Sequence, residues 1–165
     1  MGIIVGSGNL KGGIMLKILA LDPSGTGTTG ICLLKETITF KQFQHSNWAK
    51  HLTHIMALIQ AYQPSIILYE NTNYLHTRQH QGTVSLLKLL GALEGLKFTF
   101  GFIKQVDSVL VSQVKDYKGK LFKGVKKIPH LTFKFGSGWF YSAKKISLHQ
   151  LDAFLVYQIW KEQNA

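Results

Sequence analysis

The stretch that decides the fold is LKILALDPSGTGTTGICLLKETITFKQF, residues 16–43. An apolar run at residues 16–21 ends at Asp22 and is followed by turn-forming proline, serine and glycine residues. Two further runs rich in apolar and β-branched residues follow at 28–34 and 38–43. Short runs of this kind bounded by turn residues are typical of strands joined by hairpins. The stretch therefore predicts a three-stranded antiparallel meander with Asp22 at the end of its first strand.

A helix and a fourth strand are predicted next. Apolar side chains recur at helical spacing over residues 48–62, with Ser46 as a candidate N-cap residue and Pro64 ending the helix. Residues 65–69 form a short apolar run that ends at Glu70. Because a helix between two strands forms a crossover connection, we expect this strand to lie parallel to the first.

The remaining chain predicts two more helices and a fifth strand. Residues 79–96 have helical spacing, residues 98–106 are predicted to be a strand, and the Lys-rich residues 115–127 are helical or irregular. The last helix begins after Ser147, whose spacing to Gln150 is that of a capping box. The predicted fold class is α/β, with a mixed five-stranded sheet flanked by helices.

Length and composition indicate one domain. The chain has 165 residues, of which 45% are hydrophobic and 16% charged, so it is expected to form an ordinary packed core. We interpret residues 1–14, with five glycines and no acid, as a disordered leader or expression remnant, and residues 15–165 as a single domain. The sequence shows no membrane-length apolar run, no signal peptide and a single cysteine, Cys32, so we expect a cytoplasmic protein with no membrane partner.

The chain is strongly basic, with a formal net charge of +11. Residues 97–165 contain 12 Lys and no Arg against four acids, a net charge of +8. A positive half of this kind attracts polyanions, nucleic acid above all, although a solvated Lys-rich surface is the ordinary alternative. Lys in place of Arg favours contacts with phosphates over reading of bases.

Three acids stand at positions suited to metal binding. Asp22 and Glu70 each end a strand and would emerge at the same edge of a parallel pair. Asp152 lies in the apolar last helix, where an unpartnered carboxylate is costly, and His149 shares its helix face. Carboxylates gathered in this way suit Mg²⁺ or Mn²⁺. The ordinary alternatives are a turn-forming aspartate, a loop glutamate and a capping or surface histidine.

The Gly-rich stretch at residues 24–30 could also indicate a nucleotide-binding loop. It lacks the order G-x-G-x-x-G and leads into a strand, which argues against a dinucleotide loop, and it has no G-K-[ST] for a P-loop. The stretch also resembles the phosphate loop of actin-like ATPases and sugar kinases, which need two such domains. This chain has room for one.

Taken together, the motifs resemble the RuvC family of Holliday junction resolvases, with its phage-type and low-GC bacterial relatives, over nearly all of residues 16–160. The resemblance rests on five stretches in order: LALDPSGTGTTGICLL at 19–34, IILYEN at 66–71, LLKLLGALEG at 86–95, VKDYKGKLFKGVKK at 114–127 and SLHQLDAF at 147–154.

This resemblance implies an RNase H-like nuclease fold and a homodimer that nicks paired strands of a four-way junction. It also implies two Mg²⁺ ions per active site, with Mn²⁺ as substitute, held by the catalytic residues Asp22, Glu70, His149 and Asp152. The implied DNA contacts are Tyr74, Arg78, Lys115, Lys118, Lys120, Lys123, Lys126 and Lys127. The dimer is expected to use the helix at 79–96, through Val84, Leu87, Leu90 and Leu93.

Three alternatives stay open at this stage. The chain could be an RNase H-fold nuclease acting on RNA or on forks and flaps, a DNA-binding module without catalysis, or an actin-like nucleotide binder. The presence of all three acids argues against a DNA-binding module without catalysis. Cleavage of a panel of junction, fork, hybrid and RNA substrates would distinguish a junction resolvase from a nuclease that acts on RNA or on forks and flaps.

Overall fold

The predicted meander forms one half of a mixed sheet. The computed structural model describes residues 15–72 and 81–165, in which β1 (Ile18–Asp22) pairs antiparallel with β2 (Thr28–Leu34), and β2 with β3 (Ile38–Gln44). On the other side of β1, β4 (Ile66–Asn71) and β5 (Gln105–Leu110) add in parallel, which gives the order β3-β2-β1-β4-β5. The predicted α/β class with a mixed five-stranded sheet is confirmed.

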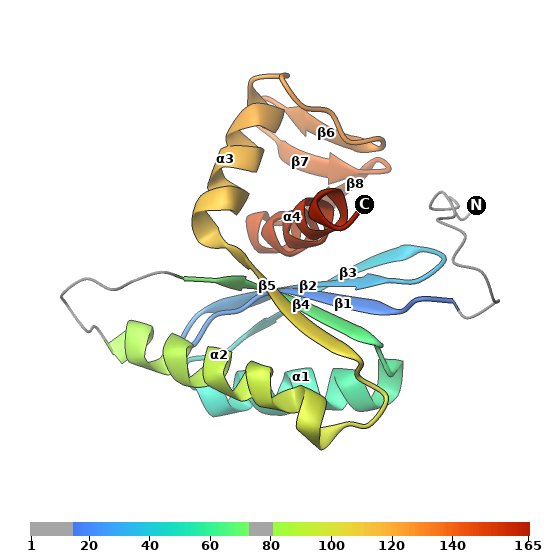
Figure 1. Cartoon of the computed structure of the whole chain (residues 1–165). Helices are drawn as coiled ribbons and strands as arrows, with labels where there is room; N and C mark the ends of the chain where they lie inside the picture. The colour runs from blue at the N-terminus through green and yellow to red at the C-terminus, as the bar shows by residue number, and fades with distance from the viewer. Residues whose placement is uncertain (1–14, 73–80) are drawn as a thin grey trace.

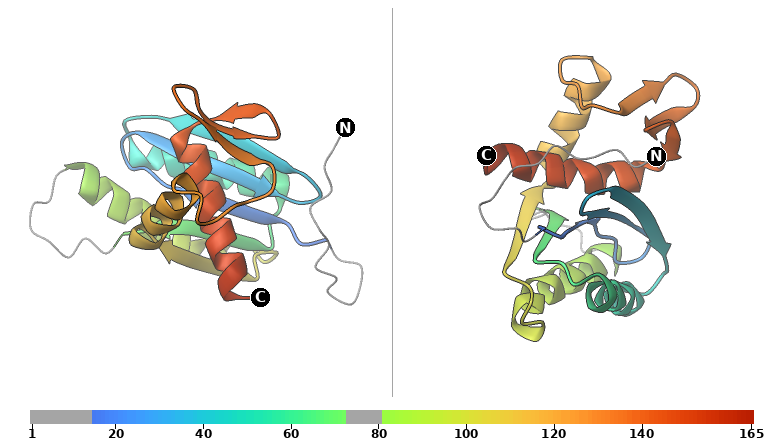
Figure 2. Two further views of the ribbon diagram at one scale, coloured as in Figure 1. Left: turned by 90° about the horizontal axis from the view of Figure 1, so that it is seen from above. Right: turned by 90° about the vertical axis from the view of Figure 1, so that its right-hand side faces the viewer.

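Helices cover both faces of this sheet. Figures 1 and 2 show two helices side by side on one face and the last helix across the other, with a small second sheet beyond it. The elements outside the main sheet are α1 (Trp48–Tyr62), α2 (Gln81–Thr99), α3 (Val111–Phe122), β6 (Leu131–Lys134), β7 (Gly138–Tyr141), β8 (Lys144–Ile146) and α4 (Leu148–Gln163).

The core is divided by the sheet into two clusters. Strand side chains alternate between faces, so Leu19 and Leu21 of β1 pack with α1 and α2, whereas Ile18 and Ala20 pack with α4. No helix in the described ranges is long and apolar enough to cross a membrane.

Two element boundaries differ from the sequence prediction. The N-cap residue of α1 is Asn47 and not Ser46: the Asn47 side chain accepts a 2.8 Å hydrogen bond from the Ala49 N–H, which satisfies a donor of the first turn. The predicted strand at 98–106 is also wrong in place, because α2 continues to Thr99 with Phe98 exposed. Strand β5 begins where Gln105 pairs with Ile66 of β4, since ladder hydrogen bonds and burial of the turn residue Ile103 outweigh local strand propensity.

The second sheet was not predicted from the sequence. Strands β6, β7 and β8 form an antiparallel meander between α3 and α4. Its inner face supplies Trp139 and Ile146 to the core beneath α4, while its outer face is largely exposed. Its strands have three or four residues each, too short for alternation of polar and apolar residues to stand out.

Candidate active site

Asp22 and Glu70 stand on adjacent parallel strands at one edge of the sheet. The pairing of Leu21 with Tyr69 sets the register of β1 and β4, so the next position on each strand carries one of the two acids. Side chains two residues earlier on both strands belong to the core beneath α4. Because side chains alternate along a strand, both carboxylates face α4.

The N-terminus of α4 brings a histidine to the first of these acids. A capping box fixes this end of the helix, as predicted: Ser147 Oγ accepts from the Gln150 N–H, and the Gln150 side chain accepts from the Ser147 N–H. In the first turn, His149 Nδ1 lies 2.9 Å from Asp22 Oδ2 and forms a hydrogen bond with it.

Gly30 permits this close approach. It pairs with Asp22 in the β1–β2 ladder. A Cβ atom at position 30 would lie 1.9 Å from the carbonyl oxygen of His149, so no larger residue fits beneath the start of α4. The glycine of the Thr29–Gly30 motif is therefore required for the placement of His149 over Asp22.

Asp152 lies one turn further along α4 and is held by a lysine. Lys118 Nζ, from α3, lies 2.7 Å from Asp152 Oδ1 and 3.0 Å from Oδ2. Both side chains are mostly buried, with exposed fractions of 28% and 18%. The sequence predicted Lys118 as a phosphate contact on the surface, but the structure places it among the carboxylates.

The electrostatics of the site reflect the burial of its carboxyl groups and, to a smaller extent, their repulsion of one another. Burial raises the pKa of Asp22 to about 6, against the lowering effect of the His149 hydrogen bond, and the charge of Asp152 raises it further. Burial raises the pKa of Glu70 to about 8, and the charges of Asp22 and Asp152 add to this effect. Ordinary values for the two groups are near 4, so both carboxyls are costly to ionise without a cation.

These residues fit a divalent cation in their chemistry. Three carboxylates and one imidazole lie around the same edge of the sheet, and a cation offsets both causes that raise two of their pKa values, burial first and mutual repulsion second. In the described residues no three His, Cys, Asp or Glu side chains already stand close enough to enclose a metal. Asp152 is instead paired with Lys118, and Asp22 with His149, so metal binding requires local rearrangement of these two contacts.

A buried polar network holds the turn that follows Asp22. Thr29 Oγ1 accepts from the Ser24 N–H at 3.0 Å and lies 2.8 Å from His51 Nδ1, while His51 Nε2 lies 2.8 Å from the carbonyl oxygen of His45. Thr29 and His51 are almost fully buried. His51 was not predicted from the sequence, because one histidine in an amphipathic helix carries no signal of its partner 22 residues earlier.

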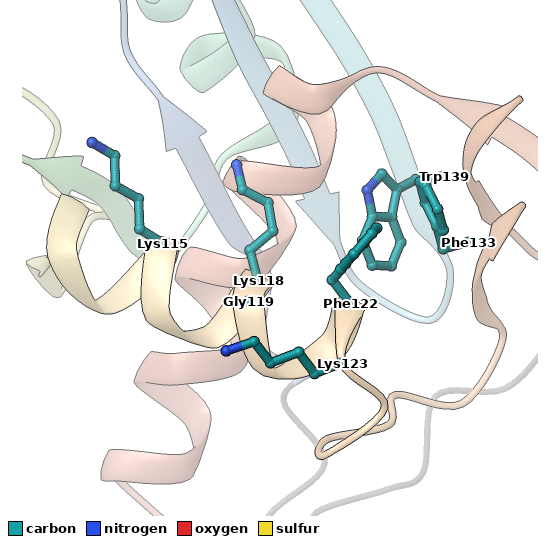
Figure 3. Close-up of a pocket in the computed structure, with 7 residues that line it drawn as sticks. All are labelled: Lys115, Lys118, Gly119, Phe122, Lys123, Phe133 and Trp139. Atoms are coloured by element: carbon teal, nitrogen blue, oxygen red, sulfur yellow. The ribbon is translucent and has the colours of Figure 1, made fainter. Parts of the chain in front are cut away.

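The predicted DNA-contacting lysines have different surroundings. Lys120 pairs with Asp116 on the exposed side of α3, and Lys126 pairs with Glu162 and lies over the ring of Tyr117. Lys127 is exposed. Lys115 and Lys123 line a pocket with Lys118 beside α3 (Figure 3). Tyr74 and Arg78, predicted as further DNA contacts, lie outside the described residues, and so do residues 1–14, which were predicted to be a leader.

The apolar side of α2 is narrower than the sequence suggested for a dimer interface. Leu90 and Leu93 are buried in the core between α2 and the sheet, so they are not available to a partner. Leu87 is exposed and Val84 is half-buried.

The fold has close counterparts among solved structures. Thermus thermophilus RuvC in complex with a Holliday junction substrate has a TM-score of 0.60 at 13% identity, over 91% of this chain and 97% of that one. Another structure of Thermus thermophilus RuvC gives 0.55 at 13% identity, over 90% and 97%. The fowlpox virus Holliday junction resolvase gives 0.52 at 13% identity, over 90% and 99%.

The likeness is one of fold. No protein-family profile matches the sequence, and no curated protein sequence matches it either. The chain therefore has the RNase H-like fold of RuvC-type Holliday junction resolvases along nearly its whole length, as the sequence motifs predicted.

Proposed function

We propose that this protein is a metal-dependent endonuclease that cuts branched DNA, with the four-way junction as its substrate. The observation that carries the proposal is the convergence of Asp22, Glu70, Asp152 and His149 at one edge of the sheet, with the pKa values of the first two raised. Perturbed carboxyls gathered in this way are typical of functional sites. The fold supports the substrate class, since it is shared with two resolvases whose names state that they act on Holliday junctions.

Asp22, Glu70 and Asp152 are the proposed ligands for Mg²⁺, with Mn²⁺ as substitute, and His149 is the fourth candidate. When bound, two such ions supply the charge that activates water and stabilises the leaving oxygen in phosphodiester hydrolysis. With the ions bound, His149 would give up its hydrogen bond with Asp22 and would lie beside the reacting groups. Lys118 would be released from Asp152 by the same ions, and its charge would then neutralise the phosphate next to the scissile bond.

The basic surface beside the site supports DNA as the substrate. Lys115 and Lys123 stand near Lys118 on α3, and Lys115 is close enough to lower the pKa of Glu70. Phosphate contacts of this kind position DNA without reading its sequence. We also propose a homodimer, because two nicks in a two-fold symmetric junction need two active sites related by the same symmetry.

A substrate panel tests this function. Purified full-length protein is incubated with Mg²⁺ and equal amounts of a synthetic four-way junction, a replication fork, a flap, an RNA–DNA hybrid and a single-stranded RNA. We expect the junction to be cut fastest, at symmetric positions in opposite strands. Preferred cutting of the hybrid or the RNA would instead support the RNA nuclease, and binding of the junction without any cutting in Mg²⁺ or Mn²⁺ would support a non-catalytic module.

A further inference from the structure

An open pocket lies between α3 and the β6–β7 hairpin, beside the carboxylates. Its volume is about 410 Å³, and it is open to solvent along one side. Figure 3 shows three aromatic rings gathered at one end and lysine side chains extending along the other. The residues that line it are Lys115, Lys118, Gly119, Phe122, Lys123, Phe133 and Trp139.

The aromatic end of the pocket is built from two elements. The rings of Phe122 and Phe133 have centroids 5.1 Å apart, and those of Phe133 and Trp139 also lie 5.1 Å apart. Phe122 is 61% exposed and Phe133 39%, whereas Trp139 is 7% exposed and forms the base. Exposed aromatic side chains in a group mark a binding surface more often than isolated ones do.

The register of the second sheet explains why these rings stand uncovered. Phe133 is paired with Trp139 across β6 and β7, so the two side chains share the inner face of that sheet. The next pair on this face, Leu131 with Tyr141, packs against the core beneath α4. The pair of Phe133 and Trp139 lies one step nearer the hairpin turn, and there the C-terminal end of α3 contributes Phe122.

The lysine end of the pocket gives it a strongly positive rim. Among the described residues, Lys115 and Lys123 form no ion pair, and two acids close to α3 are already paired: Asp152 with Lys118, and Asp116 with Lys120. Lys118 is thus shared by the pocket and the catalytic carboxylates. A ligand held here would carry negative charge at one end and an apolar ring at the other. Only the Lys118 side chain would separate it from the Asp152 carboxylate.

We propose that this pocket holds one unpaired nucleotide of the DNA substrate, its base stacked on the ring of Phe122 with Phe133 at the edge of the base, and its phosphates held by Lys115 and Lys123. This inference rests on the proposed nuclease function for its choice of DNA. Stacking on aromatic side chains requires a base that has left the duplex stack, and a branch point supplies such bases. The charge of the rim favours a nucleotide over an apolar segment of protein or a second copy of this chain, itself at +11.

Binding without catalysis tests the pocket. The full-length protein in EDTA is titrated into fluorescein-labelled oligothymidylate and into a blunt DNA duplex of equal length, and affinity is read by anisotropy. A single 2-aminopurine within the oligothymidylate reports stacking by quenching. The variants are Phe122→Ala, Phe122→Leu and Phe122→Tyr, with Phe98→Ala as control, because Phe98 is 84% exposed on α2, on the opposite side of the main sheet.

We expect Phe122→Ala and Phe122→Leu to bind the single strand about tenfold more weakly, the loss of about 1.4 kcal/mol of base stacking. The quenching of 2-aminopurine should decrease together with the affinity. Phe122→Tyr and Phe98→Ala should bind the single strand within about twofold of the wild-type affinity. Duplex affinity should change less than about twofold in every variant. All variants should keep the wild-type melting temperature, since position 122 is exposed.

Three results would overturn the proposal. Equal loss of affinity for duplex and single strand would assign the surface to general DNA contact, and full binding by Phe122→Leu would remove the need for a ring. If the wild type sediments as a dimer and Phe122→Ala as a monomer with unchanged single-strand affinity, the aromatic surface would be an interface with a second copy of the chain. Asp22→Asn should bind the single strand in EDTA as the wild type does. A failure of the proposed nuclease function and a failure of the proposed nucleotide pocket are therefore distinguished by separate measurements.

Discussion

Lys118 and Asp152 form the contact that links the basic surface of α3 to the carboxylates: Lys118 Nζ lies 2.7 Å and 3.0 Å from the two oxygens of Asp152. A lysine in this position competes with a cation for the same carboxylate. The ion pair therefore stabilises the site without metal, and under the proposed function it has to open for Asp152 to bind a metal ion.

Removal of this lysine should strengthen metal binding. Lys118→Met leaves Asp152 without a partner and removes a positive charge, so we expect Mn²⁺ to bind about five- to tenfold more tightly without DNA, about 1 kcal/mol of released ion pairing. Titration calorimetry measures this. Lys120→Met is the matched control, since Lys120 pairs with Asp116 on the exposed side of the same helix. Unchanged affinity in Lys118→Met would mean that Asp152 is not a ligand.

The stability of the metal-free protein should fall as the pH rises. The folded-state pKa is about 6 for Asp22 and about 8 for Glu70, above their ordinary values near 4, so the folded state holds more protons than the unfolded state between pH 4 and 8. Stability is therefore lost across this window. Asp22→Asn keeps an acceptor for His149 and removes the charge, and in EDTA at pH 8.5 it should raise the free energy of unfolding by about 2 kcal/mol.

Urea unfolding of wild type and Asp22→Asn at pH 4.5 and pH 8.5 checks this expectation. The difference in the free energy of unfolding should shrink at the lower pH, where the Asp22 carboxyl is largely protonated in the folded state. If Asp22→Asn is less stable than the wild type at pH 8.5, the ionised Asp22 carboxylate stabilises the fold and does not destabilise it.

The close approach at Gly30 gives a test of how α4 is positioned. Gly30→Ala places a methyl group on the His149 carbonyl oxygen, so the start of α4 must shift. We expect a loss of about 1–3 kcal/mol of stability and weaker Mn²⁺ binding. Gly91→Ala is the control: nothing lies within 4 Å of a Cβ there, and in mid-helix it should raise stability by about 0.5–1 kcal/mol. Wild-type affinity of Gly30→Ala for Mn²⁺ would mean that metal binding does not depend on the position of the start of α4.

The lysines of α3 should contribute unequally to DNA binding. Lys115 and Lys123 line the pocket, whereas Lys126 is paired with Glu162. Exchange of Lys115 and Lys123 for Met should lower the slope of log affinity against log salt by about two contacts, at about 0.9 per contact for duplex DNA. Lys126→Met should change it by less than half of one contact. Equal slopes for wild type and the Lys115, Lys123 variant would place the DNA on another surface.

The sequence predicted the parts of the molecule that depend on local pattern. Asp22 and Glu70 could be placed because each ends an apolar run and a crossover helix makes the two strands parallel. The capping box fixed the start of α4, and with it the turn that carries His149. These are signals carried by neighbouring residues, so no tertiary information was needed.

Contacts between distant segments were beyond sequence reasoning. The pairing of Lys118 with Asp152 spans 34 residues, and Lys118 is one lysine among six in a basic segment with nothing local to distinguish it. The strand at 105–110 was displaced in the prediction because its start depends on pairing with β4. The role of Gly30 appears only where α4 meets β2, since a glycine after a threonine in a strand has many ordinary explanations.

Cleavage of a synthetic four-way junction by single-site variants tests the central claim most directly. The wild type, Asp22→Asn, Glu70→Gln and Asp152→Asn are compared in Mg²⁺, with junction affinity measured in Ca²⁺ as a control for folding and binding. We expect the wild type to nick the junction and each variant to lose cleavage by at least about a thousandfold, on the order of 4 kcal/mol, with junction affinity equal or higher. Near wild-type cutting by any one of the three variants, or no cutting by the wild type, would contradict it.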